Sequence, residues 1–537
     1  MNCVTEGSGS RSCPMTTRKE SPILAQISPV IAARSLLSGR LLGTNALSNV
    51  VTQATPLVAA AVAIPMLIAK LGADKFGLLS LSWIVVGYLS LFDMGIGRAL
   101  TKLTAERIGA GALHEIPTLI WTCVTLMAVF GAAVTVATIY VARWLTTNAL
   151  NVPSALQGEF FNSLYILSFA APLVIVTAGL RGVLEAHQEL RTANLTRFAM
   201  GIGTYIGPVL VLPFTHSLTA IVAFLVALRL VALMPHISAC YTVVPALRSG
   251  YSFDRRLIKP LYKFGFWITC NSMIGQFMIS FDRFYIASAI SPSAVSYYSV
   301  PSELTSRIWI VSSAACGVLF PAFATSATAD PDTCRALFQS ATKVLCLVLF
   351  ALSLVLTVFS PEILAVWLGP AFAAQSHLVA QILPIGAFAL GLEAVSYVYL
   401  QGIGRPELPT IVNFLEIPLY YIALKFLVSQ YGLKGAALAS AGRLVIDFAC
   451  LFGLSCFYLK LRPTDTIKLT SGIVSLGLLL VIGLVPLALP MKIVMFVILT
   501  SIGLAGAWSF VLDPNDRVFI VRFGAPYWQR IARMARS

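Results

Sequence analysis

Long apolar runs separated by short polar segments dominate the chain. Each run is about 20 residues or longer, enough to cross roughly 30 Å of hydrocarbon as a helix. The apolar positions are continuous rather than alternating, which favours α-helices over a membrane β-barrel. The runs number fourteen: 44–70, 77–97, 118–143, 161–184, 196–214, 218–244, 264–290, 297–323, 341–360, 378–400, 409–429, 433–459, 470–488 and 491–512. The pattern predicts an all-α polytopic membrane protein with about 14 transmembrane helices.

The positions of Lys and Arg predict the orientation of these helices. Cytoplasmic loops of membrane proteins carry an excess of basic residues. With the N-terminus placed inside, most of the 37 Lys and Arg fall on the inner side. The outer loops and helix ends then hold only Lys70, Lys75, Arg143, Lys425, Lys434 and Lys492. We therefore expect an even number of helices and both termini in the cytoplasm.

Composition agrees with this class of protein and disfavours others. Hydrophobic residues make up 58% of the chain and charged residues 11%, against about 25% charged residues in soluble domains. The net charge of +15 follows from the basic inner loops, so we expect attraction to anionic lipid headgroups rather than to nucleic acid. The ten Cys show no CxxC spacing, so we expect no disulfide framework, no metal site and no cofactor.

Two parts of the chain resemble each other. Gly43 and Asn49 recur as Gly265 and Asn271, and the tripeptide RLV occurs at 229–231 and 443–445. We expect two six-helix lobes related as parallel repeats, followed by a helix pair; transporters of this type rock two halves about a central site. Chance similarity between apolar helices is the other interpretation. The expected segments are a cytoplasmic start (1–40), an N-lobe (41–247), a C-lobe (256–460), the helix pair (470–512) and a basic amphipathic tail (513–537).

Several short motifs carry a resemblance to a known family. They are Leu71-Gly72 followed by Phe76-Gly77, the stretch FDMGIGR at 92–98, and FGFW at 264–267. With these motifs the chain resembles polysaccharide-biosynthesis flippases, of the superfamily that includes multidrug exporters and lipid II flippases. The resemblance implies transfer of a polyprenyl-diphosphate-linked oligosaccharide across the bacterial inner membrane, for export of an exopolysaccharide, capsule or O-antigen. It also implies the pathway's polymerase and glycosyltransferases as partners.

Charged residues inside the apolar runs are the candidate functional residues. A charge in hydrocarbon costs several kcal/mol, so it usually faces a cavity or a partner. Four lie at similar depth in the outer half of two neighbouring helices: Asp282, Arg283, Glu303 and Arg307. The i,i+4 spacing of Glu303 and Arg307 predicts an ion pair. We expect the four to form one net-neutral network, as either a static clamp or a gate, with Arg283 and Arg307 as candidate substrate contacts.

Arg229 and Arg443 lie near the middle of their helices, in the repeated RLV tripeptide. A guanidinium group donates paired hydrogen bonds to phosphate oxygens, so both are candidate ligands of a diphosphate. The alternative is packing against a neighbouring carbonyl or carboxylate. For Arg443, Asp447 one turn further along the helix offers such a partner.

Four more residues are candidate coupling or gate residues. Glu393 and Glu416 lie on adjacent antiparallel helices with no base within four residues, so coupling to H⁺ or Na⁺ is a hypothesis for them. Asp93 and Arg98, at the predicted cytoplasmic end of the second helix, either anchor that end or form part of an inner gate.

Two other functions remain as alternatives. A cation-coupled multidrug or metabolite exporter would have the same two lobes. Such exporters often use an acid in the first lobe, and run 44–70 contains none. A membrane enzyme is disfavoured, because the outer loops are short and the five His form no local pair to act as a base.

Overall fold

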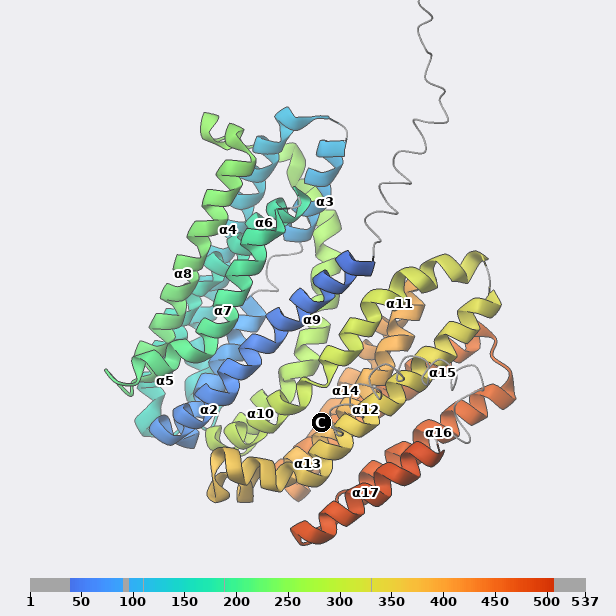
Figure 1. Ribbon diagram of the computed structural model, residues 1–537. Helices are drawn as coiled ribbons and strands as arrows, with labels where there is room; N and C mark the ends of the chain where they lie inside the picture. Colours follow the sequence, from blue (N-terminus) through green and yellow to red (C-terminus); the bar gives the residue numbers. More distant parts are fainter. Residues whose placement is uncertain (1–38, 90–95, 110, 188, 330, 507–537) are drawn as a thin grey trace, which may run out of the picture. The chain divides into compact units, whose positions relative to one another are not determined.

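The computed structural model describes residues 39–89, 96–109, 111–187, 189–329 and 331–506 (Figure 1). Backbone contacts divide the chain into Met1–Gln53 and Ala54–Ser537. Of the first unit, the structure describes residues 39–53. Throughout the described residues the regular structure is helical, without strands.

Most helices follow the predicted apolar runs, but runs 161–184 and 297–323 are each divided between two helices, and the helix Ile96–Gly109 lies almost wholly outside the runs. Those that precede residue 250 are α2 (Gly39–Leu89), α3 (Ile96–Gly109), α4 (Ile116–Trp144), α5 (Ser154–Ser168), α6 (Ala170–Ala186), α7 (Leu190–Val211) and α8 (Leu218–Val243). Those that follow are α9 (Ile258–Ala289), α10 (Pro292–Ser306), α11 (Trp309–Ala329), α12 (Pro331–Leu368), α13 (Pro370–Gly402), α14 (Glu407–Tyr431), α15 (Leu433–Leu459), α16 (Pro463–Ile482) and α17 (Leu489–Gly506). Among the described residues, nine helical segments are individually long and apolar enough to cross a membrane. The predicted fold class, a polytopic all-α membrane protein, is confirmed.

Two predicted spans form the single element α2, which breaks at Gly72. This glycine has φ 79° and ψ 166°, a conformation that only glycine adopts readily. The break falls between runs 44–70 and 77–97, where the apolar pattern is interrupted.

Gly72→Ala is expected to destabilise the protein by about 1–3 kcal/mol, because a Cβ is strained in this backbone conformation although no atom lies within 4 Å of its position. Gly453→Ala is the matched control, since Gly453 lies inside α15 and also has open space around it. Alanine is favoured there, so the melting temperature should fall for Gly72→Ala and stay equal or rise for Gly453→Ala. Equal melting temperatures would contradict the assigned strain.

The helices before residue 250 pack mainly among themselves, with α6 against α3, α4 and α8, and α8 also against α5 and α7. In the later part α13 packs against α10, α11, α12 and α15. It is the most enclosed of the nine candidate spans, with 83% of its most apolar window buried. The pair α16 and α17 packs against α12. The polar residues of α13 are therefore held away from lipid.

The helices before residue 250 form what we call the first part, and those after it form the later part. At their predicted outer ends these two parts touch each other, in a contact that we call the outer seam. It contains Ala73, Gly77, Asn151, Ala287, Ser288, Pro292 and Ser296. Ser296 Oγ donates to the carbonyl of Ala73 at 2.5 Å, and Asn151 Nδ2 donates to the carbonyl of Ser288 at 2.6 Å. A Cβ added to Gly77 would lie 1.8 Å from the carbonyl oxygen of Pro292. The seam is therefore closed, and it requires a residue without a side chain at position 77.

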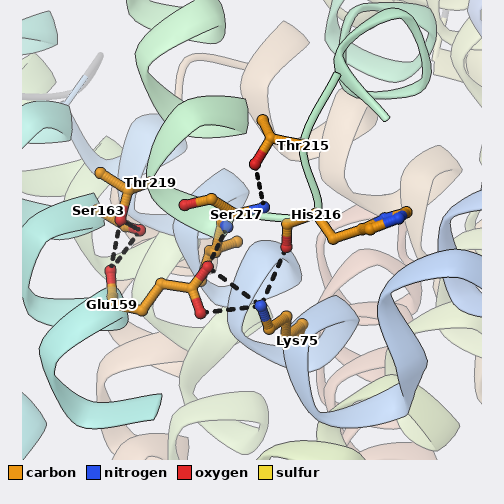
Figure 2. A network of polar contacts seen from close by, with 8 residues as sticks. Lys75, Glu159, Ser163, Thr215, His216, Ser217 and Thr219 are labelled. Carbon is orange, nitrogen blue, oxygen red and sulfur yellow. Dashed lines mark hydrogen bonds and ion pairs between the residues drawn. The ribbon is translucent and has the colours of Figure 1, made fainter. Parts of the chain in front are cut away.

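A second polar cluster joins helix ends within the first part (Figure 2). Lys75 Nζ lies 2.9 Å from Glu159 Oε2 and donates to the carbonyl of His216 at 3.0 Å. Glu159 Oε1 accepts the backbone N–H of Leu218, the first residue of α8. A carboxylate at a helix N-terminus satisfies a free N–H and the helix dipole. The cluster ties α2, α5 and α8 together at one end.

Candidate functional site

Asp282 is buried in α9 and its charge is met by hydrogen bonds. Its Oδ2 accepts from the hydroxyl of Tyr298 on α10 at 2.5 Å, and its Oδ1 accepts from the backbone N–H of Arg283 at 2.8 Å. A buried carboxylate needs such donors. The predicted partner from the following helix is thus present, but it is a tyrosine and not an arginine.

The other three charged residues of the predicted network, Arg283, Glu303 and Arg307, do not contact Asp282 through their side chains in any hydrogen bond or ion pair of the described residues. Arg307 Nη2 lies 2.8 Å from Glu303 Oε2, so the predicted i,i+4 pair is confirmed. Arg283 Nη2 donates to Ser302 Oγ at 2.8 Å. The prediction of a single four-member ionic network is wrong. Asp282 and Arg283 occupy adjacent positions and point in different directions, so each meets a neutral hydroxyl group of α10.

A pocket of about 290 Å³ lies between α2, α9 and α10. Its lining includes Arg283, Glu303, Gln276, Trp83 and several serines. Three buried polar atoms around it have no hydrogen-bond partner among the described residues: Trp83 Nε1, Arg283 Nε and Ser299 Oγ. Buried polar groups without a partner cost free energy, so this arrangement suits a polar ligand. We call it the central pocket.

Trp83 forms the aromatic part of the central pocket. Its ring meets Phe76 and Tyr205 edge to face, at centroid distances of 6.0 and 5.4 Å. An indole held in this way offers a flat apolar surface and one N–H donor. The pocket therefore combines a cation, an acid, hydroxyls and an aromatic face, which is a set suited to a phosphorylated sugar.

A second group of charges lies deeper in the later part, where α13, α14 and α15 meet. Glu393, Glu416 and Asp447 are 7%, 5% and 3% exposed. Arg443 Nη1 lies 3.7 Å from Glu416 Oε2, and its guanidinium lies 5.3 Å from the centre of the Tyr420 ring. The carboxyl groups of Glu393 and Asp447 interact with each other. We call the three acids and Arg443 the carboxyl cluster.

The carboxyl cluster contains three acids and one base. Glu393 Oε2, Asp447 Oδ1 and both oxygens of Glu416 have no hydrogen-bond partner in the described part of the chain. Within that part, no three His, Cys, Asp or Glu side chains are arranged to hold a metal ion. Arg443 forms its ion pair with Glu416 of the neighbouring helix, which sequence spacing did not reveal. Its charge also interacts with that of Asp447, the partner expected one turn along the helix.

Arg229 takes part in neither site. Arg229 Nη1 donates to the carbonyl of Leu225 in its own helix at 3.0 Å, in line with the alternative that it packs against a carbonyl. Asp93 lies outside the described residues, and so does the side chain of Arg98. Sequence reasoning did not single out Gln276, Ser299 or Ser302, although the serine-rich stretch SVPSELTS at 299–306 was a usable signal.

Comparison with known proteins identifies the family. The family described as "Polysaccharide biosynthesis protein" matches residues 42–327. A Shigella flexneri protein named "Putative O-antigen transporter" is 24% identical over 403 residues, which cover 75% of this chain and 95% of that protein.

Solved structures show a similar fold. The lipid II flippase MurJ in an inward closed conformation has a TM-score of 0.65 at 14% identity, covering 86% of this chain and 97% of that chain. An inward-facing multidrug resistance MATE transporter of the MOP superfamily has a TM-score of 0.64 at 15% identity, covering 76% and 94%. At these identities the likeness concerns the fold alone. With the family match spanning more than half of its residues, the chain belongs to the polysaccharide biosynthesis protein family, with the fold of MOP-superfamily transporters.

Proposed function

We propose that this transporter flips a polyprenyl-diphosphate-linked oligosaccharide from the cytoplasmic to the outer face of the bacterial inner membrane, by alternating access. The exported product would be a surface polysaccharide: an exopolysaccharide, a capsule or O-antigen. The central pocket is the observation that carries the proposal. Arg283, Trp83 and Ser299 all line this space of about 290 Å³ between helices of the two parts, and each has one buried polar atom without a hydrogen-bond partner among the described residues.

The central pocket accounts for recognition of the polar end of such a lipid. Arg283 lines the pocket and carries a guanidinium group suited to phosphate oxygens, and its Nη2 is held by Ser302. Trp83 offers a face on which a sugar ring can pack. The polyprenyl tail would remain in the lipid while the headgroup crosses.

Both termini are assigned to the cytoplasm, because the basic residues are concentrated on that side.

The carboxyl cluster is assigned to coupling. Three acids around Arg443 leave at least one carboxyl without a counter-charge, which favours uptake of a proton. We assign H⁺ rather than Na⁺ as the coupling ion, because a proton neutralises a buried carboxyl directly. The chain itself needs no catalytic residue for this task; pathway glycosyltransferases and a polymerase would act before and after it.

Transport of a fluorescent lipid-linked oligosaccharide in proteoliposomes tests the proposal. Arg283→Gln is expected to lower kcat/KM about 10-fold or more, because a charged donor is lost. Arg283→Lys should restore only part of it, since Lys lacks the planar pair of donors. Arg143→Gln is the matched control: Arg143 is exposed and at the predicted outer side, and its loss should leave transport unchanged.

Two results would overturn the proposed function. One is absence of any protein-dependent movement of the labelled lipid. The other is proton-driven movement of tail-less drugs or metabolites with no movement of the lipid-linked sugar, which would favour the cation-coupled exporter.

A further inference from the structure

A larger cavity, of about 440 Å³, lies away from the central pocket. It is enclosed by the beginning of α12 and by the ends of α13 and α15, with Arg335, Tyr399, Tyr458 and Lys460 in its lining. All three helix ends lie on the side that the proposed orientation places in the cytoplasm. We call it the inner pocket.

Two basic residues, Arg335 and Lys460, line the inner pocket, and Arg405 lies beside its Tyr458. Arg335 Nε donates to the carbonyl of Leu459 at 2.8 Å, which ties α12 to the end of α15. The guanidinium of Arg405 lies 5.8 Å from the centre of the Tyr458 ring. Asp332 pairs with Arg335, and Glu407 lies 3.3 Å from Arg405. Arg335 and Arg405 thus each have an acidic partner, whereas no ion pair of the described residues includes Lys460.

The backbone at Lys460 is unusual. Lys460 has φ 51°, and it is the one non-glycine residue with positive φ in the described part of the chain. Its N–H bonds the carbonyl of Phe457, and the N–H of Leu461 bonds the carbonyl of Cys456, so α15 ends in a Schellman motif. Glycine is the usual residue at this position, because a Cβ is strained there. The chain instead keeps a cation at the edge of the cavity.

We propose that the inner pocket binds the phosphate headgroup of an anionic phospholipid of the cytoplasmic leaflet. Basic pockets between transmembrane helices on this side suit such headgroups. Lys460 supplies the uncompensated positive charge, and Arg335 supplies guanidinium donors beside its ion pair with Asp332. Ile403 and Leu459 supply apolar wall for the lipid's glycerol and upper chains. The apolar wall favours a lipid over free phosphate. The inference rests on the proposed orientation, but not on the transported substrate.

Binding of defined lipids to the purified full-length protein tests this inference, by native mass spectrometry and by tryptophan-fluorescence titration. Phosphatidylglycerol and cardiolipin should bind more tightly than phosphatidylcholine. Arg335→Gln and Lys460→Gly should each weaken binding of the anionic lipids about 5-fold, and the double variant roughly 25-fold. Lys468→Gln is the matched control: Lys468 is exposed on α16, outside the pocket lining, and its loss should leave the affinity nearly unchanged.

Lys460→Gly separates recognition from folding. Glycine relieves the positive φ, so the melting temperature should be equal to or above that of the native chain while lipid affinity falls. Native affinity in the double variant would overturn the inference, and so would saturation by inorganic phosphate or glycerol phosphate at the same concentrations as the lipids. Loss of oligosaccharide transport with lipid binding intact would instead count against the proposed function alone.

Discussion

Arg443→Gln is expected to destabilise the protein by about 3–5 kcal/mol, one of the two largest effects that we anticipate. Arg443 is the base of the carboxyl cluster, and its side chain is 10% exposed against 6% for that of Glu416. Removing it leaves buried carboxyls without their counter-charge, and it also removes the contact with the Tyr420 ring. The melting temperature in detergent, read as the loss of the monodisperse chromatographic peak on heating, measures the effect.

Two variants control this result. Arg229→Gln makes the same change at the repeat-related position, where the guanidinium contacts only a carbonyl of its own helix among the described hydrogen bonds, so stability should change little. Adding Glu416→Gln to Arg443→Gln should restore part of the stability, because the two side chains interact. No rescue by the second change, together with equal losses at 229 and 443, would show that the carboxyl cluster is not held by Arg443.

Gly77→Ala is expected to block closure of the outer seam and to stop transport. The new Cβ would lie 1.8 Å from the carbonyl oxygen of Pro292, and backbone atoms cannot yield as a flexible side chain can. Overpacking of this kind costs about 1–3 kcal/mol, which displaces a two-state equilibrium roughly 5- to 150-fold. Because only the closed seam contains the clash, the protein should accumulate in a state that is open on the outer side.

Labelling of a cysteine placed at Ser296, by a membrane-impermeant maleimide from the outer face, measures this shift. Labelling should be slow when Gly77 is retained and fast in the Gly77→Ala variant. Gly275→Ala in α9 is the matched control, since no atom lies within 4 Å of its added Cβ. Slow labelling and normal transport in Gly77→Ala would contradict the assignment of the seam as a closed gate.

Features that depend on neighbours along the chain could be predicted from the sequence. The apolar runs identified most of the helices, the gap between the first two runs located the break in α2, and the i,i+4 spacing identified the pair of Glu303 with Arg307. In each case local chain geometry alone fixes the distance between the groups.

Contacts between helices could not be predicted in the same way. Asp282 meets Tyr298, and Arg443 meets Glu416, because of how each helix is rotated about its axis. That rotation is set by the packing of many side chains, and a turn of one residue position would give different partners. The meeting of the three acids of the carboxyl cluster is of the same kind, so local spacing marked the acids but not their association.

The contact of Lys75 with Glu159 affects which helix ends can move independently. Because one carboxylate both holds a lysine of α2 and caps the beginning of α8, neither helix end can shift without breaking a charged contact. We therefore expect the adjoining ends of α2, α5 and α8 to move as one unit in any rearrangement that leaves this contact intact.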